Sequence, residues 1–330
     1  MRQGRDPGEH LEMAATRPGV SVVVPVYNSE PTLHELTQRI SAVLSTVSPD
    51  YEILFINDGS RDRSWQRVVQ LASAGGRVRG VSLMRNYGQH NALLCGIREA
   101  RYETIVTIDD DLQNPPEEIP KLLDALTDDV DVVYGCPDEE QHGLWRNSAS
   151  RITKLALKTA MGAEIAERVS AFRAFRTRVR EAFANYVGPS VSIDTLLTWG
   201  TSHFDFVVVR HDPRIIGDSN YTFRKLMAHA LNMMTGFSTL PLQFASFVGF
   251  TFTVFGLVVL SFVLLRYLVQ GTTVPGFPFL ASVIAIFSGA QLFALGVIGE
   301  YLARMHFRLM DRPPYCVRDR AGVDEAAKIS

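Results

Sequence analysis

The sequence predicts an α/β domain with a mostly parallel sheet, followed by an amphipathic helix and two membrane-spanning helices. Short runs of β-branched residues alternate with helix-length stretches through residues 20–134, which is typical of βαβ units. Those short runs are apolar almost throughout, as expected of strands that are buried on both faces of a parallel sheet. Two later stretches, residues 244–265 and 277–298, contain no charged residue, and each is about as long as the ~20 residues that a membrane-crossing helix needs.

The strands and helices of the first part of the chain can be assigned in order. The strand segments are rich in β-branched and aromatic residues, and we place them at residues 20–26, 51–56, 78–83, 104–108 and 131–134. The segments between them have the length and composition of helices, and we place these at residues 31–47, 62–74, 88–101 and 116–127. Open α/β sheets bind ligands at the carboxyl ends of their strands, so the polar residues that follow each strand form the candidate site.

Further elements are expected in the second part of the chain. Residues 144–187 are rich in Arg and are expected to be helical, and residues 205–210 (DFVVVR) are expected to form a strand. Residues 222–240 are expected to form an amphipathic helix that leads into the first span. The chain is thus divided into a flexible tail, a globular domain, a juxtamembrane helix, a transmembrane hairpin and a cytoplasmic tail, at residues 1–19, 20–220, 221–240, 241–303 and 304–330.

The two uncharged stretches could also be core helices of a soluble domain. Soluble helices rarely stay apolar on all sides over such a length, so membrane spans are favoured. Arg214, Arg224 and Lys225 precede the first span and several arginines follow the second, whereas the connecting segment contains only Arg266. Because cytoplasmic segments carry the excess of Lys and Arg, both termini and the α/β domain are expected to face the cytoplasm.

Composition and missing motifs argue against several classes of protein. The net charge is −2, so no basic field indicates a nucleic-acid partner. The first strand is followed by PVYNSE and not by GxGxxG, and the chain has no GxxxxGK[ST], so neither a dinucleotide-binding fold nor a P-loop is indicated. The three cysteines are isolated, lack the spacing of a metal site and are expected to be reduced thiols. These observations do not exclude a sheet that binds a nucleotide sugar, with a metal ion on the diphosphate of that sugar.

An acidic cluster follows the fourth expected strand, in the segment TIDDDLQNPPEE. Residues two apart share one side of an extended chain, so Asp109 and Asp111 are expected to point the same way, and Gln113 continues that side if the extended geometry persists. Carboxylate and amide oxygens suit Mg²⁺ or Mn²⁺, particularly where phosphates supply the remaining ligands. The alternative is an acidic loop that binds no metal and only helps to cap a helix.

The residues after the acidic cluster have the composition of a helix start. Asn114 is expected to be the N-cap, Pro115 to lie in the first turn and Glu117 to occupy the capping-box position. The aspartates would then lie directly before the helix.

Motifs spread along the chain resemble those of family 2 glycosyltransferases. In order, the chain contains the segments VVVPVYNSE, FINDGSRD, RNYGQHNALLCG and IDDDLQNPPEEIP. Within that family the chain is most similar to the polyisoprenyl-phosphate glycosyltransferases, and the resemblance extends to GEYLARMHFRLMDRPPY after the second span. The resemblance implies a GT-A fold with a Rossmann-like, mostly parallel sheet. It also implies a nucleotide-sugar donor, a polyprenyl-phosphate acceptor and a location in a bacterial inner membrane.

The resemblance also implies residues that bind the donor. Pro25 and Tyr27 match the motif that frames the base, and Asp58 matches an aspartate that recognises base or ribose. The complete set of implied donor-binding residues is Pro25, Tyr27, Asn28, Glu30, Asp58, Gly59, Asp109, Asp110, Arg173 and Ser219. The implied ligands of Mg²⁺ or Mn²⁺ are Asp109, Asp111 and Gln113.

Residues for catalysis and for the acceptor phosphate follow from the same resemblance. They are Asp111, Glu167, Arg146, Ser150, Arg151 and Arg214. The four-residue spacing of Arg146 and Ser150 puts both on one face of a helix, and guanidinium groups match phosphate geometry. A solvated basic face, or one attracted to anionic lipid headgroups, is the alternative for this region. Arg214 is expected to help neutralise the departing diphosphate.

Three positions depart from the pattern of the family. Ser29 replaces a glutamate, Glu167 replaces an aspartate, and Asn220 replaces a lysine near the donor phosphates. These departures leave room for a membrane-anchored, non-catalytic nucleotide-sugar sensor or scaffold.

The hypothesis favoured by the sequence is inverting transfer of a sugar from a UDP-sugar to undecaprenyl phosphate at the cytoplasmic membrane face. A polysaccharide synthase of the same fold is a further alternative, but its QxxRW motif is matched only by QHGLWR, in which the order differs. The resemblance allows a homo-oligomer such as a tetramer.

Overall fold

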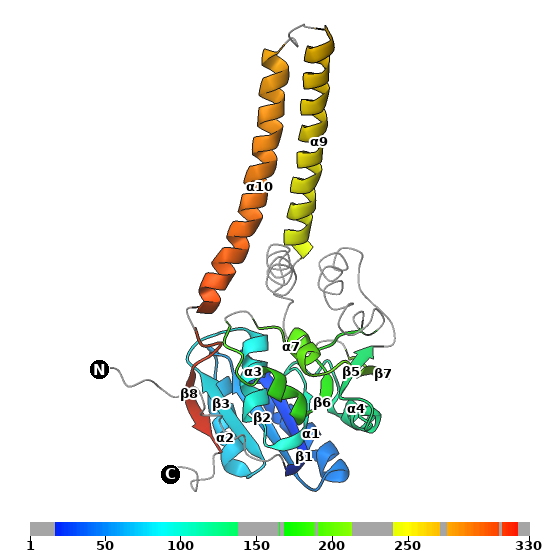
Figure 1. Ribbon diagram of the computed structural model, residues 1–330. Helices are drawn as coiled ribbons and strands as arrows, with labels where there is room; N and C mark the ends of the chain where they lie inside the picture. Colours follow the sequence, from blue (N-terminus) through cyan, green and yellow to red (C-terminus); the bar gives the residue numbers. More distant parts are fainter. Residues whose placement is uncertain are drawn as a thin grey trace, which may run out of the picture.

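The computed structural model describes residues 17–137, 165, 168–188, 191–212, 240–270, 276–309 and 312–322. Figure 1 shows an α/β domain from which two long helices rise side by side, with the described C-terminal strand returning to the domain. The predicted site residues Arg146, Ser150, Arg151, Glu167, Arg214 and Ser219 lie outside the described residues, as does the amphipathic helix expected at residues 222–240, except for Leu240.

The described strands form one eight-stranded sheet in the order β7-β5-β6-β4-β1-β2-β3-β8. Their bounds are β1 Arg17–Val26, β2 Tyr51–Asn57, β3 Val78–Leu83, β4 Tyr102–Thr107, β5 Val132–Pro137, β6 Arg173–Arg176, β7 Phe204–Val209 and β8 Val317–Ala321. Strand β1 pairs in parallel with β2 and β4, β2 pairs in parallel with β3, and β5 pairs in parallel with β7. Strand β6 is antiparallel to both of its neighbours, and β8 is antiparallel to β3. The predicted α/β fold with a mostly parallel sheet is confirmed.

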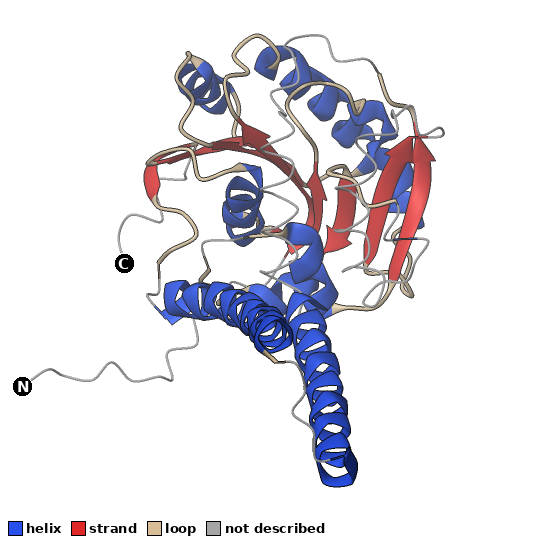
Figure 2. Ribbon diagram, turned by 90° about the horizontal axis from the view of Figure 1, so that it is seen from above, coloured by secondary structure: helices blue, strands red, loops and turns tan. Residues whose placement is uncertain are grey.

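Helices cover both faces of this sheet, as Figure 2 shows from above. Helices α3 (Gln89–Glu99) and α7 (Ile193–Gly200) pack on one face, against a core that includes Val23, Leu54 and Ile56. Helices α1 (Leu33–Val47), α2 (Ser64–Ala74) and α4 (Ile119–Ala125) cover the other face, against Val22, Val24 and Phe55. Alternate residues of one strand thus enter opposite cores, which explains why the strands are apolar throughout.

Helix α1 illustrates how spacing selects the buried face. Leu33, Leu36, Ile40 and Leu44 recur every three or four residues, and all four side chains are fully buried. Complete burial of such a side chain contributes on the order of 1.5–3 kcal/mol, so this stripe fixes the helix on the sheet.

The helix expected over residues 144–187 is wrong for its last part. Residues Arg173–Arg176 form strand β6 in the middle of the sheet, and Thr177–Phe183 form a 3₁₀ helix, η2. Phe172 and Ala174 enter one core, whereas Phe175 enters the other. This alternation with period two is that of a strand buried on both faces, and the high Arg content of the segment obscured it.

Both expected tails contribute residues to the sheet. Strand β1 begins at Arg17, inside the segment that was expected to be a flexible tail ending at residue 19. Strand β8, within the expected cytoplasmic tail, adds an edge strand beside β3. Helix α7 was not predicted from the sequence.

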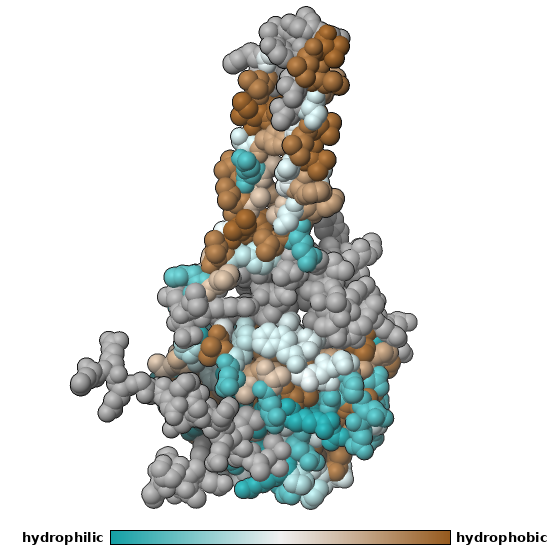
Figure 3. Space-filling view, viewed as in Figure 1, coloured by the Kyte–Doolittle hydropathy of each residue, from teal (hydrophilic) through white to brown (hydrophobic). Residues whose placement is uncertain are grey.

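The two long helices, α9 (Leu240–Gln270) and α10 (Phe277–Leu309), contain the predicted spans. By length and composition, Leu242–Val259 and Ile286–Ala303 could each cross a membrane, and almost none of their residues are buried by protein. The helices touch through edge-to-face aromatic pairs, Phe244 with Phe293 and Phe252 with Phe287. Figure 3 shows the hydrophobic surface that the hairpin exposes, in contrast to the hydrophilic domain below it.

Candidate active site

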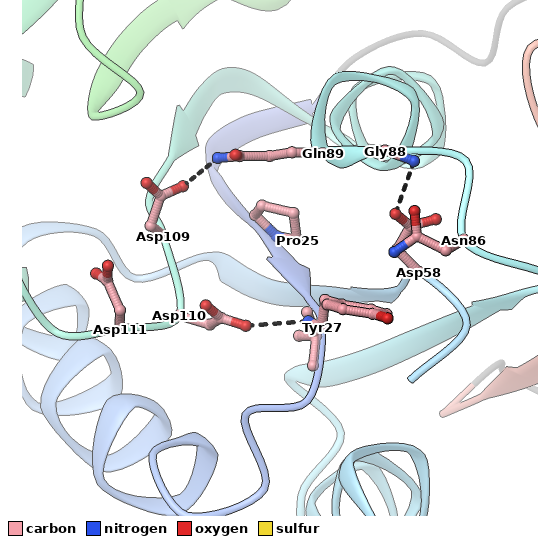
Figure 4. Close-up of a pocket in the computed structure, with 10 residues that line it drawn as sticks. Pro25, Tyr27, Asp58, Asn86, Gly88, Gln89, Asp109, Asp110 and Asp111 are labelled. Atoms are coloured by element: carbon pink, nitrogen blue, oxygen red, sulfur yellow. Dashed lines mark hydrogen bonds between the residues drawn. The ribbon is translucent and has the colours of Figure 1, made fainter. Parts of the chain in front are cut away.

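A cavity of about 370 Å³ opens at the carboxyl ends of the central parallel strands. Strands β1, β2, β3 and β4 end at Val26, Asn57, Leu83 and Thr107, and the cavity is lined by residues at or directly after these ends. The lining residues are Pro25, Val26, Tyr27, Asp58, Asn86, Gly88, Gln89, Asp109, Asp110 and Asp111. Figure 4 shows these side chains around the cavity. The expectation that ligand-binding residues follow the strands therefore agrees with the position of the cavity.

Asp58 is buried at the base of the cavity and is held by the β3–α3 loop (residues 84–88). Its two carboxylate oxygens accept hydrogen bonds from the backbone amides of Tyr87, at 2.7 Å, and Gly88, at 2.8 Å. Burial disfavours the charged form more strongly than these amides favour it, so the pKa of Asp58 is raised. The same carboxylate thus orders the loop and faces the cavity.

The chain turns within the acidic segment, so the extended geometry that would bring Gln113 to the side of Asp109 and Asp111 does not persist. Strand β4 ends at Thr107, and Leu112 adopts a left-handed conformation with φ 60°, which turns the chain. Asp109 accepts a hydrogen bond from the side chain of Gln89 at 2.7 Å, and Asp111 accepts one from the backbone amide of Gln113 at 3.1 Å. Asp109 and Asp111 both line the cavity, whereas Gln113 does not.

Asp110 points toward β1, as Figure 4 shows. Its carboxylate accepts a hydrogen bond from the backbone amide of Tyr27 at 3.2 Å, and its backbone carbonyl accepts one from the Thr32 hydroxyl at 2.7 Å. Burial raises the pKa of Asp110 to about 6, and the nearby charge of Asp111 acts in the same direction. Asp110 therefore ties the acidic segment to the end of β1.

The predicted capping of the helix after the acidic cluster is wrong. The helix starts as a short 3₁₀ segment, η1 (Pro116–Glu118), with Pro115 at its N-cap and no side-chain cap. The Asn114 side chain instead lies 3.3 Å from the ring of His211, and Glu117 pairs with Arg39 at 2.7 Å. These long-range partners replace the local bonds that a capping box would make.

A comparison with family models identifies the class of protein. The model described as glycosyl transferase family 2 matches residues 21–184, which include every residue that lines the cavity. An undecaprenyl-phosphate 4-deoxy-4-formamido-L-arabinose transferase of Shewanella sediminis is 36% identical over 313 residues, 94% of this chain and 94% of that protein. The chain belongs to glycosyl transferase family 2. It is therefore a glycosyltransferase, and the predicted family and class of enzyme are confirmed.

Two further relatives of this glycosyltransferase carry the same name. The Pseudomonas paraeruginosa protein is 36% identical over 301 residues, 90% of this chain and 89% of that protein. The Yersinia enterocolitica protein is 32% identical over 309 residues, 93% of this chain and 94% of that protein.

Solved structures agree with the fold of the glycosyltransferase. Glucosyl-3-phosphoglycerate synthase from Mycobacterium tuberculosis, in complex with Mn²⁺, UDP and glucosyl-3-phosphoglycerate, has a TM-score of 0.52 and 19% identity. The similarity covers 66% of this chain and 78% of that one. The complex of that synthase with Mn²⁺ and UDP-glucose gives a TM-score of 0.51 and 20% identity, over 66% of this chain and 77% of that one. These structures confirm the predicted GT-A fold.

Three predicted donor-binding residues of the glycosyltransferase lie beside the cavity without lining it. Asn28 has φ 56° and accepts the backbone amide of Arg61 at 2.8 Å through its side-chain oxygen. Gly59 has φ 65°, and a Cβ there would lie 2.5 Å from the backbone of Arg85, so only glycine fits this approach of two loops. The backbone amide of Glu30 donates to Asp62 at 3.2 Å. These residues order the loops around the cavity.

Arg173, also predicted to bind the donor, lies inside the domain and does not line the cavity. It is 1% exposed, pairs with Asp194 of α7 and donates to the Thr107 hydroxyl at 3.2 Å. Asp194 also accepts the hydroxyl of Tyr134 at 3.2 Å. This buried network joins strands β4, β5 and β6 to helix α7.

Gly88 and Gln89 both line the cavity but were not among the site residues predicted from the sequence. Their segment, RNYGQH, begins two residues after the end of strand β3, and the rule that places ligand-binding residues after strands would have found them. The Gly88 φ of 98° explains a glycine at this position.

Proposed function

We propose that the glycosyltransferase transfers a sugar from a UDP-sugar to undecaprenyl phosphate at the cytoplasmic face of the membrane, with inversion at the anomeric carbon. The observation that carries this proposal is the extent of similarity to the Shewanella sediminis transferase. An alignment over 94% of the chain is too long to leave out the apolar hairpin, so the relative matches both the cavity domain and the two apolar helices.

The cavity suits a nucleotide-sugar donor in size and in chemistry. Its volume of about 370 Å³ lies within the ~300–1,000 Å³ usual for small-molecule sites. Tyr27 lines the cavity and is 43% exposed, so its ring can stack on a base. The Asp58 carboxylate can accept hydrogen bonds from the base or the ribose. The UDP bound to the structurally similar synthase supports a UDP-sugar as the donor.

The residues of the acidic segment fit a divalent cation. Asp109 and Asp111 bring two carboxylates to one cavity, and hard oxygen ligands of this kind suit Mg²⁺ or Mn²⁺. Within the described residues, no three His, Cys, Asp or Glu side chains form a closed metal site, so the donor diphosphate would have to supply further ligands. A cation bound there would stabilise the charge that develops on the departing diphosphate. Mn²⁺ in the solved synthase supports this assignment, and Gln113 as a third protein ligand stays a prediction.

The acceptor reaction requires little proton transfer. A phosphate oxygen of the lipid attacks the anomeric carbon, a new carbon–oxygen bond forms, and the bond to the donor diphosphate breaks to release UDP. A phosphate monoester is largely ionised near neutral pH, so orienting the acceptor in line is the main task of the protein. We assign this task to Arg146, Ser150 and Arg151, with Glu167 as a further orienting group and Arg214 on the leaving diphosphate, as the sequence predicts.

A donor panel tests the proposed function. The full-length protein in detergent is given undecaprenyl phosphate, Mg²⁺ or Mn²⁺, and one donor at a time: UDP-glucose, UDP-4-deoxy-4-formamido-L-arabinose or GDP-mannose. We expect release of UDP that requires both the lipid and the metal, and the donor that supports it identifies the sugar. Nucleotide binding without lipid-dependent release for any of these donors would contradict the proposal.

A further inference from the structure

The β3–α3 loop connects the cavity to the C-terminal segment, which we define as residues 312–322. On its cavity side, the amides of Tyr87 and Gly88 hold both oxygens of Asp58. Just beyond the loop, at the start of α3, the Gln89 side chain donates to Asp109. The conformation of this short stretch therefore sets the positions of two carboxylates that face the proposed donor.

On the side away from the cavity, the β3–α3 loop and the start of α3 are hydrogen-bonded to the C-terminal segment. The backbone amide of Met84 donates to the carbonyl of Cys316 at 2.9 Å, directly beyond the pairing of β3 with β8. The side chain of Asn91, in the first turn of α3, donates to the carbonyl of Pro314 at 2.6 Å. Asn91 is buried, so this bond is shielded from water.

Packing reinforces these hydrogen bonds. Tyr87 of the loop and Tyr315 and Val317 of the C-terminal segment pack against the same hydrophobic core. The guanidinium of Arg98 lies 5.8 Å from the centre of the Tyr315 ring, and burial raises the pKa of the Tyr315 hydroxyl to about 12. The C-terminal segment thus packs beside the β3–α3 loop and helps to hold it against the core of the domain.

The C-terminal segment follows the apolar hairpin of α9 and α10 closely in the sequence. Helix α10 ends at Leu309, and only Met310 and Asp311 separate it in sequence from residues 312–322. Figure 1 shows β8 at the edge of the sheet, below the end of α10. The position of the β3–α3 loop therefore depends on the C-terminal segment, which follows the second apolar helix in the sequence.

We propose that the C-terminal segment holds the β3–α3 loop in its donor-binding conformation, and that Asn91 is the positioning residue that makes this connection. The proposal rests on the proposed function, because it takes the cavity to be the donor site. Asn91 does not line the cavity and acts through Gly88, Gln89 and the Asp58 carboxylate.

The test compares a buried hydrogen bond with a partly buried one of the same length. Asn91→Ala removes the 2.6 Å bond to Pro314, and the control Thr177→Val removes the 2.6 Å bond from the Thr177 hydroxyl to the carbonyl of Tyr102, at the start of β4. Hydrogen exchange of the full-length protein in lipid nanodiscs, without nucleotide, reports on the loop itself. Titration of UDP in the presence of Mn²⁺ reports on the cavity.

We expect Asn91→Ala to speed amide exchange of residues 84–88 about fivefold and to weaken UDP binding by about the same factor, as loss of one buried hydrogen bond implies. Thr177→Val should change neither quantity, although both variants lower the unfolding midpoint to a similar extent. Asn91→Ser retains a hydroxyl donor and should give intermediate values, and it replaces Asn91→Ala if that variant does not fold.

Equal loop exchange and equal UDP affinity in Asn91→Ala, Thr177→Val and wild type would overturn the proposal. So would an exchange increase in Asn91→Ala that is spread evenly over the sheet. Failure of the wild type to bind UDP would count against the proposed function alone, since the exchange measurement needs no nucleotide.

Discussion

Two groups of carboxylates in this glycosyltransferase are stabilised in different ways. Asp131 and Asp194, which brace the sheet, are each paired with an arginine, Arg178 and Arg173 respectively. Asp58 and Asp110, at the cavity, accept hydrogen bonds from neutral backbone amides. The pKa of Asp131 is lowered, whereas the pKa values of Asp58 and Asp110 are raised, that of Asp110 to about 6.

This difference distinguishes the carboxylates that stabilise the domain, called the framework group, from the carboxylates at the candidate site. An arginine beside a carboxylate satisfies its charge within the protein, so the pair contributes to packing and leaves little for a ligand. Backbone amides fix the position of a carboxylate but add no positive charge. The carboxylates of the cavity can therefore be oriented by the protein and still respond to a bound nucleotide or cation.

The largest effect is expected for Asp111→Asn. We expect at least a hundredfold loss of UDP release, because the variant removes one of two carboxylates assigned to the cation and its stabilisation of the leaving diphosphate. The unfolding midpoint should not fall, since the charge of Asp111 repels that of Asp110. Both quantities can be measured on one detergent preparation. Asp124→Asn, on an exposed position of α4, is the control and should keep wild-type turnover.

Turnover of Asp111→Asn within a few-fold of the wild type would place the cation elsewhere. A large drop in the unfolding midpoint would instead mean that Asp111 stabilises the domain, as Asp131 and Asp194 do.

Much of this comparison was predictable from the sequence. The position of Asp58 and Asp109 at one edge follows from two apolar strands that are each followed within two residues by an aspartate. The turn at Leu112 was not predictable, because a leucine with positive φ is disfavoured locally and only its surroundings hold it there.

The buried ion pair between Arg173 and Asp194 was not predictable, for a different reason. The resemblance implied that Arg173 binds the donor, and this stays a prediction. Its partner Asp194 lies in a helix that the sequence did not reveal, and no local pattern links residues 21 positions apart. Strand β8 was missed because VRDRA is polar, as edge strands often are.

The second largest effect is expected for Asp194→Ala. Removal of this carboxylate leaves the guanidinium of Arg173 buried without its partner, which should cost about 3–5 kcal/mol in the free energy of unfolding. Denaturant unfolding monitored by tryptophan fluorescence measures the change. The double variant Arg173→Met with Asp194→Leu removes both charges and should recover most of the loss.

If the double variant were as unstable as Asp194→Ala, the uncompensated charge would not be the cause. A direct role of Arg173 in donor binding predicts instead that the double variant regains stability but loses UDP affinity, and a UDP titration distinguishes this from a role in the framework alone.

The smallest effect concerns pH, and it tests the comparison most directly. Because the pKa of Asp58 is raised above its ordinary value of 3.8, the folded state binds this proton more tightly than the unfolded state does. The contribution of Asp58 to the free energy of unfolding therefore falls as the pH rises from about 3.8 through its folded pKa. Asp58→Asn should lose one amide hydrogen bond, or ~1 kcal/mol, and this cost should be larger at acid than at neutral pH.

Asp131→Asn should show the opposite trend. Burial disfavours its charge, but the Thr201 hydroxyl and the Arg178 guanidinium outweigh burial and lower the pKa of Asp131. The stabilisation by Asp131 is then complete above pH 3.8 and is lost as the pH falls through the folded pKa, so this variant should cost more at neutral than at acid pH. Unfolding of both variants across pH 3 to 7 measures the two slopes. Slopes of the same sign would mean that arginine pairing does not separate the two groups, and that burial alone governs the carboxylates of this domain.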